Sequence, residues 1–167
     1  MSAMTDANRV GLGAYVTLCS PRGREIRTAD YDGEPRCAPR DDRAHVEAAV
    51  SWICRAQDRT AGSGLPGVFS FIDGWQVPSA EATGDLVPTL FDAAVWLERN
   101  DLHERAIRMA DWLITRQFPD GDFTPSRVFS TGQIIFGLVR AWRETHKCEY
   151  LDAALRAGDW LVRNQDN

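Results

Sequence analysis

The sequence has no long apolar segment. None of its uninterrupted apolar runs approaches the roughly 20 residues that a helix needs to span a bilayer. The first residues also lack the apolar core of a signal peptide. We therefore expect a cytoplasmic protein that does not act at a membrane.

Lysine is almost absent and positive charge is not concentrated anywhere. The 167 residues carry a formal net charge of −5, and Lys147 is the only lysine among 19 basic residues. General nucleic-acid binders need a concentrated basic face to neutralise phosphates. The composition therefore argues against a nucleic-acid partner.

Cysteine and histidine do not occur at the spacings that hold metals. The chain contains no Cys-x-x-Cys and no Cys/His pairing at ligand spacing, and its three histidines have no serine or carboxylate partner at useful spacing. We expect no metal and no cofactor. Four scattered cysteines are interpreted as free thiols in a reducing compartment: Cys19, Cys37, Cys54 and Cys148.

Two short segments recur along the chain. A Thr-Gly pair begins an apolar helical run at Thr83 and again at Thr131, and we call this interval the repeat period. A Trp-x-x-x-x-Gln segment occurs three times, and its last two copies are separated by the same period. Two segments with one period indicate a helical hairpin that is used repeatedly. The Trp-Gln segments are Ser51–Gln57, Asp111–Gln117 and Asp159–Gln165.

The chain divides into an irregular N-terminal arm, residues 1–42, and a helical-hairpin domain, residues 43–167. The arm lacks helical periodicity, although a short strand at 13–19 is compatible with its sequence. Apolar spacing in the rest predicts an all-α fold of five helices, with Pro88 bending the second. The fourth is apolar all round in its first turns, so we expect it to be buried. The expected ranges are 43–58, 79–99, 103–117, 131–145 and 150–164.

Odd-numbered predicted helices are amphipathic and even-numbered ones are more apolar. This alternation is typical of a curved array whose outer helices meet water and whose inner helices line a central space. Gly84 and Gly132, at equivalent places in two inner helices, are expected to allow close helix packing. The alternative is that their exposed N–H groups contact a ligand.

The Trp-Gln segments carry a family resemblance. Gln117 to Phe123, which follows Asp-Trp-Leu, reads Gln-x-x-x-Gly-x-aromatic and resembles the glutamine-tryptophan repeat of the terpenoid cyclase and prenyltransferase α/α toroids. A wider set looks closer to toroid proteins of bacterial polysaccharide biosynthesis. That set comprises Gly74-Trp75, Glu81-x-Thr83-Gly84, Thr131-Gly-Gln133 and Ala157–Leu161.

The resemblance covers residue 43 to the end and implies a partial α/α toroid that acts on a carbohydrate. Five helices make about half a ring, so one apolar flank is left uncovered. We expect two or more copies to associate, closing a toroid through an isologous interface; the alternative is a truncated product or fragment. The Asp-x-Asp-Asp motif of hopene-type cyclases is missing, which disfavours a terpenoid cyclase-like reaction.

Acidic side chains are the candidate catalytic groups. Glu81, Asp85 and Asp92 share one face of the second predicted helix, and Asp73 precedes that helix beside Trp75. Paired carboxylates can divide into acid and base where the cavity raises the pKa of one, so we assign this role to Glu81, Asp85 and Asp73. The alternative is that Glu81 and Asp85 only complement the helix dipole.

Substrate-binding candidates lie at the starts of the inner helices and in the loop before the first of them. Trp75 offers a stacking face for a sugar ring, although loop aromatics more often only pack on a core. Helix N-termini and an upstream arginine can hold an anionic group. The binding candidates are Trp75, Thr83, Arg127, Thr131 and Gln133.

The leading functional hypothesis is a carbohydrate-active protein of polysaccharide metabolism. It would act as a hydrolase, lyase or epimerase on an acidic glycan or sugar. The alternative is a non-catalytic subunit that binds a glycan or a protein, and a terpenoid cyclase-like protein is a further alternative. The expected partners are a small-molecule or oligosaccharide substrate and further copies of the chain.

Overall fold

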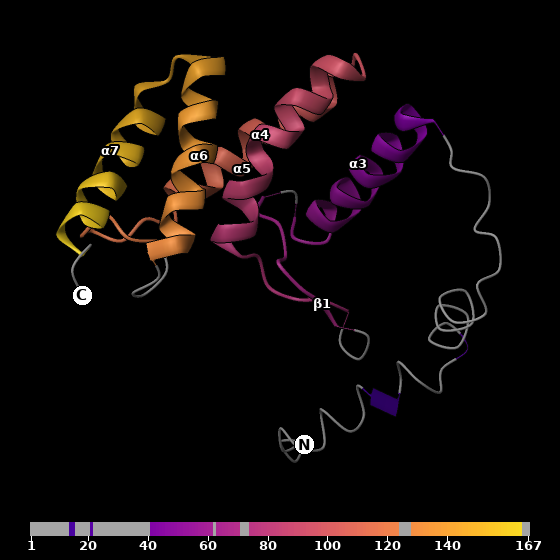
Figure 1. Ribbon diagram of the computed structural model, residues 1–167, viewed down its shortest axis with the longest axis horizontal. Helices are drawn as coiled ribbons and strands as arrows, with labels where there is room; N and C mark the ends of the chain where they lie inside the picture. Colours follow the sequence, from indigo (N-terminus) through magenta and orange to yellow (C-terminus); the bar gives the residue numbers. More distant parts are fainter. Residues whose placement is uncertain are drawn as a thin grey trace.

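The computed structural model (Figure 1) describes residues 14–15, 21, 41–61, 63–70, 74–123 and 128–164. The predicted arm, residues 1–42, therefore lies almost wholly outside the described residues. Within it, Ala14 and Tyr15 are helical, which does not agree with a strand at 13–19.

The described residues form an all-α structure, as predicted. A hairpin of two short antiparallel strands, β1 (Phe69–Ser70) and β2 (Gly74–Trp75), is inserted before the second helix. Five helices make up the rest: α3 (Asp42–Asp58), α4 (Ala80–Trp96), α5 (Asn100–Ile114), α6 (Val128–Thr145) and α7 (Cys148–Arg163).

Local sequence explains where the helices begin. The Asp41 carboxylate accepts a hydrogen bond from the Ala44 backbone N–H at 2.7 Å, and the Ser79 hydroxyl caps α4 in the same way. The third helix begins three residues earlier than predicted. This helix is α5, and the turn that leads into it from α4 contains Glu98. Glu98 adopts a left-handed backbone (φ 57°) that a non-glycine residue rarely takes.

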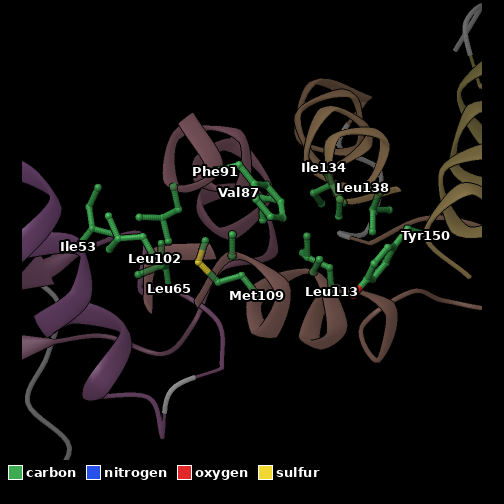
Figure 2. Packing of buried hydrophobic residues seen from close by; sticks show 14 of the residues in the cluster. Ile53, Leu65, Val87, Phe91, Leu102, Met109, Leu113, Ile134, Leu138 and Tyr150 are labelled. Atoms are coloured by element: carbon green, nitrogen blue, oxygen red, sulfur yellow. The ribbon is translucent and has the colours of Figure 1, made fainter. Parts of the chain in front are cut away.

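The helices pack against their neighbours in two layers, with α4 and α6 in one layer and α5 in the other. The most extensive contacts join α4 to α6, α4 to α5 and α6 to α7. Figure 2 shows the core between the layers, with Phe91 of α4 and Ile134 of α6 facing Met109 and Leu113 of α5. These four side chains are fully buried. In Figure 1, α3 lies at one end of the row and α7 at the other.

Glycine brings α4 and α6 together. A Cβ atom at Gly84 would lie 2.6 Å from Cα of Ile134, and one at Gly137 would lie 2.5 Å from the carbonyl oxygen of Gly84. The backbones therefore touch where any larger residue would separate them. The expectation of close packing agrees with this geometry at Gly84, but at Gly132 it is wrong, because nothing lies within 4 Å of a Cβ built there.

The expectation that the fourth helix is buried all round is also wrong. One side of α6 is buried against the core, but Phe129 and Phe136 on its opposite side are largely exposed. No described helix covers that side. The apolar composition of α6 therefore predicts that it packs on neighbouring helices. It does not predict that one side of α6 has no described helix beside it.

Candidate functional site

The repeated glutamine is a structural joint between successive outer helices. At the end of α3, the side-chain amide of Gln57 donates to the carbonyl oxygens of Ser63, in the next loop, and Arg105, on α5. Nη1 of Arg105 donates to Oε1 of Gln57 at 2.9 Å and to Asp58 at 2.8 Å. Gln57 is fully buried. The first joint is the name used below for these residues together: Gln57, Asp58, Ser63, Gly64, Leu65, Thr83 and Arg105.

The second glutamine repeats this arrangement one hairpin later. The amide of Gln117 donates to the carbonyl oxygens of Gly121 and Ala153, and Arg156 donates to Oε1 of Gln117. Ala153 follows Arg105 by one repeat period, so the two acceptors are equivalent. The second joint is the name used below for these residues together: Gln117, Gly121, Asp122, Thr131, Ala153 and Arg156.

The two threonines proposed to bind substrate belong to these joints. Thr83 is fully buried; its hydroxyl accepts from the Leu65 backbone N–H at 2.8 Å and donates to the carbonyl oxygen of Ser79. Thr131, equally buried, donates to the carboxylate of Asp122 at 2.8 Å. These bonds within the protein favour a structural role for both hydroxyls over contact with a ligand.

A pocket of about 620 Å³ lies at the base of the β-hairpin, where the segments that flank the hairpin meet the N-terminal parts of α4 and α6. Its polar lining from the helices includes Glu81 and Asp85 on α4 and Gln133 on α6. The structure therefore places three of the predicted site residues around one cavity. The other lining residues come from the segment around the hairpin and from α4: Gly67, Val68, Gln76, Val77, Ser79 and Ala82.

The two carboxylates in the pocket differ in surroundings. Glu81 is half-buried, and its Oε2 atom accepts a hydrogen bond from the Ser130 hydroxyl of α6 at 2.6 Å. Asp85, one turn later, is exposed. Asp92, on the same face in sequence, lies outside the pocket lining and pairs with Arg140 at 2.7 Å. Ser130 was missed from the sequence because its pairing with Glu81 depends on how α4 and α6 pack.

An aromatic cluster joins the hairpin strands to α3, next to the segments that line the pocket. Trp75 of β2 packs against Trp52 of α3, with ring centroids 4.7 Å apart, and against Phe69 of β1, 4.9 Å away. Trp52 and Phe69 are each about half exposed. Trp52, Trp112 and Trp160 occupy the same place in the three Trp-Gln segments, and nothing in the sequence distinguishes them. The exposed face of Trp52 is therefore a second feature that the sequence does not reveal.

Two predicted site residues, Asp73 and Arg127, lie outside the described residues. Among the residues that are described, no three His, Cys, Asp or Glu side chains gather as a metal site would require. No helix in the described part of the chain is long and apolar enough to cross a membrane.

Burial perturbs one ionisable group close to the first joint. The pKa of the Cys54 thiol is raised, chiefly by burial, while the charge of nearby Arg105 opposes this effect. A buried thiol with a raised pKa is a poor nucleophile. Cys54 is therefore a packing residue and not a candidate for the chemistry of the site.

Comparisons with protein-family models, with curated proteins and with solved structures give no match to this chain.

Proposed function

We propose that this chain is a carbohydrate-active protein whose saccharide ligand binds in the pocket at the base of the β-hairpin. The observation that carries the proposal is the convergence of Glu81, Asp85 and Gln133 on one cavity. Carboxylates and amides are suited to the hydroxyl groups of a sugar, because ionised acceptors form strong hydrogen bonds with hydroxyl donors.

The aromatic cluster supports the same ligand class. Trp52 and Phe69 each keep about half of their surface exposed. Phe69 directly follows Val68 of the pocket lining, and Trp52 packs on Trp75, which directly precedes Gln76 of that lining. Aromatic faces contact the C–H face of a sugar ring, while neighbouring carboxylates bind its hydroxyls. A ligand longer than one sugar would contact both regions.

The lining favours a sugar that is recognised through its hydroxyls over an acidic one. The described lining contains two carboxylates and no basic side chain. A uronate or sulfated sugar would therefore meet like charge. The expectation of an acidic glycan was based on the N-termini of the inner helices and on Arg127, which lies outside the described residues.

Glu81 and Asp85 are the proposed acid/base pair of a hydrolase, lyase or epimerase reaction. Glu81 is fixed by Ser130, whereas Asp85 is open to solvent. General acid–base catalysis requires a side chain that is held in position, as the Ser130 hydrogen bond holds Glu81. The second candidate, a non-catalytic glycan-binding subunit, is favoured by the exposure of Asp85, because catalytic carboxylates are usually shielded from water.

The test measures saccharide binding by calorimetry for a panel of neutral and acidic oligosaccharides, followed by product analysis. For any sugar of the panel that the wild-type chain binds, Glu81→Gln should weaken binding by about tenfold. The reason is that a hydrogen bond to a charged group contributes about 1.5 kcal/mol or more. Asp92→Asn is the matched control, because it removes a carboxylate from α4 outside the pocket.

The outcomes separate the two candidates. Under the catalytic proposal, Glu81→Gln and Asp85→Asn abolish product formation. Under the binding-subunit candidate, the wild-type chain binds a sugar but forms no product. Failure of the wild-type chain to bind any sugar, or equal weakening by Asp92→Asn, would contradict the proposal.

A further inference from the structure

The two carboxylates of the pocket have no cation beside them among the described residues. Glu81 is bonded to the uncharged Ser130 hydroxyl, and none of the described ion pairs includes Glu81 or Asp85. Asp92, further along α4, shows the contrast, because Arg140 lies 2.7 Å from its carboxylate. The pocket thus carries negative charge that the described residues do not neutralise.

The spacing of Glu81 and Asp85 makes this uncompensated charge costly. They lie four residues apart on one face of α4, and like charges at this spacing destabilise a helix. The helix dipole favours a negative charge in the first turn, where Glu81 lies. That effect falls off beyond the first turn and therefore does little for Asp85. A cation bound between the two carboxylates would remove the repulsion.

The pocket suits an organic ammonium better than a metal ion. The described residues offer no group of three or more His, Cys, Asp and Glu side chains that could hold a metal. An ammonium group carries three N–H donors, which a few oxygen acceptors can satisfy. Glu81 and Asp85 supply two such acceptors, and the side-chain amide of Gln133 on α6 supplies a third in the same lining.

The remaining lining suits a sugar ring that carries this ammonium. Val68 and Val77, from the segments that flank the hairpin, line the pocket and are 60% and 83% exposed. Such apolar groups can cover the C–H face of a ring while polar groups bind its substituents. The pocket volume of about 620 Å³ lies within the usual range of small-molecule sites. A linear polyamine would bring the same charge but no ring to contact the valines.

We propose that the ligand of this pocket is an amino sugar with a free amine, whose ammonium group lies between Glu81 and Asp85. The inference rests on the proposed function and narrows its ligand class. An acidic sugar would be repelled by the two carboxylates, and a neutral sugar would leave their charge uncompensated. N-acetylation removes the positive charge of the amine, so an acetylated amino sugar should behave as a neutral sugar does.

The test measures binding to the full chain by calorimetry, with three β-linked oligosaccharides of equal length, built from glucosamine, N-acetylglucosamine or glucose. The pH is mildly acidic, so that the glucosamine amines are protonated. The glucosamine oligosaccharide should bind about tenfold more tightly than the other two at low salt, because exposed ion pairs are individually weak. This preference should fall as ionic strength rises, since salt screens exposed charges.

Asp85→Asn should reduce the preference to about threefold or less, because one of the two carboxylates is lost. The amide that replaces it still accepts a hydrogen bond from a sugar hydroxyl, so binding of the glucose oligosaccharide should change little. Asp92→Asn is the matched control, because it removes one negative charge from α4 outside the pocket, and it should leave the preference unchanged. Spermidine, which has the charge without the ring, should bind more weakly than the glucosamine oligosaccharide.

The outcomes separate this inference from the proposed function. Equal binding of the three oligosaccharides, a preference that survives Asp85→Asn, or a preference lost in Asp92→Asn would overturn the inference while sugar binding stands. No binding of any of the three would contradict both the inference and the proposed function. Spermidine binding as tight as that of the glucosamine oligosaccharide would overturn the inference, because charge alone would then be recognised.

Discussion

The glutamines of the first and second joints make equivalent contacts across different lengths of chain. The segment from Gln57 to Thr83 is nearly twice as long as the segment from Gln117 to Thr131. In both, the glutamine binds the following loop and a backbone carbonyl of the next outer helix. The repeat is therefore defined by these hydrogen bonds and not by the length of chain between them.

The additional length of the first joint contains the β-hairpin and much of the pocket. Val68, Gln76 and Val77, which line the pocket, belong to the longer loop, and so does Trp75 of the aromatic cluster. The shorter loop of the second joint has no such hairpin among its described residues. The candidate site thus lies where one repeat departs from the other, as loops on a rigid scaffold often carry function.

Gly84 and Gly132 occupy equivalent positions of two repeats, and substitutions at these two positions should differ most in their effect on the free energy of unfolding. Gly84→Val should lower the free energy of unfolding by about 3 kcal/mol, because its side chain would force α4 from Ile134. Gly132→Val should change it by less than about 0.5 kcal/mol. Both are measured by urea denaturation. Equal destabilisation by the two changes would show that the helices are not in the contact described.

The two glutamines offer the next comparison. Gln57→Ala should cost about 3 kcal/mol, since it removes a fully buried side chain and leaves two carbonyl oxygens without their donor. Gln117 is only half-buried, so water can replace its amide and Gln117→Ala should cost about 1.5 kcal/mol.

Thermal or urea unfolding of these variants, with Gln133→Ala as control, tests the order. Gln133 is partly exposed in the pocket lining, and its truncation should be nearly neutral for stability. If Gln117→Ala were the more damaging change, the second joint and not the first would hold the array together.

The smallest effect concerns Tyr150, which stands where the preceding hairpin has Leu102. Burial raises the pKa of the Tyr150 hydroxyl, and its hydrogen bond to Asp111 at 2.5 Å raises it further. A pKa raised on folding stabilises the protein fully below the ordinary tyrosine value of about 10, and this contribution is lost as pH rises above it. The free energy of unfolding should therefore fall by up to about 1.4 kcal/mol per pH unit above pH 10.

Tyr150→Phe should remove this slope and cost about 1 kcal/mol at neutral pH, where the bond to Asp111 is lost. Urea denaturation at several pH values measures both effects. Tyr15→Phe, at an exposed tyrosine, is the control. An unchanged alkaline slope in Tyr150→Phe would mean that another group causes it.

Sequence periodicity was sufficient for the helices and their order, because buried apolar positions recur at helical spacing whatever the tertiary arrangement. The Ser79 cap and the position of Pro88 inside α4 were also predictable from local chemistry. The start of α5 was not predictable, because Glu98, in the turn before it, adopts a left-handed backbone that a glutamate rarely takes.

The candidate site was only partly predictable for a related reason. Glu81 and Asp85 could be placed on one helix face from their spacing, but Gln133 joins them only because α6 lies beside α4. Thr83 and Thr131 looked like ligand contacts at helix starts. Their hydroxyls are instead used within the joints, because each joint needs a partner for a buried polar group of its loop.

The pairwise packing of the helices has a consequence for how a disturbance spreads. In the described structure α3 has no extensive contact with α6 or α7, and reaches them only through α4 and α5. Stability in such a row is a sum of each unit and its interfaces with adjacent units, as in a one-dimensional chain of coupled spins. An alteration at α7 should decay before it reaches α3, so the two ends of the molecule can change independently.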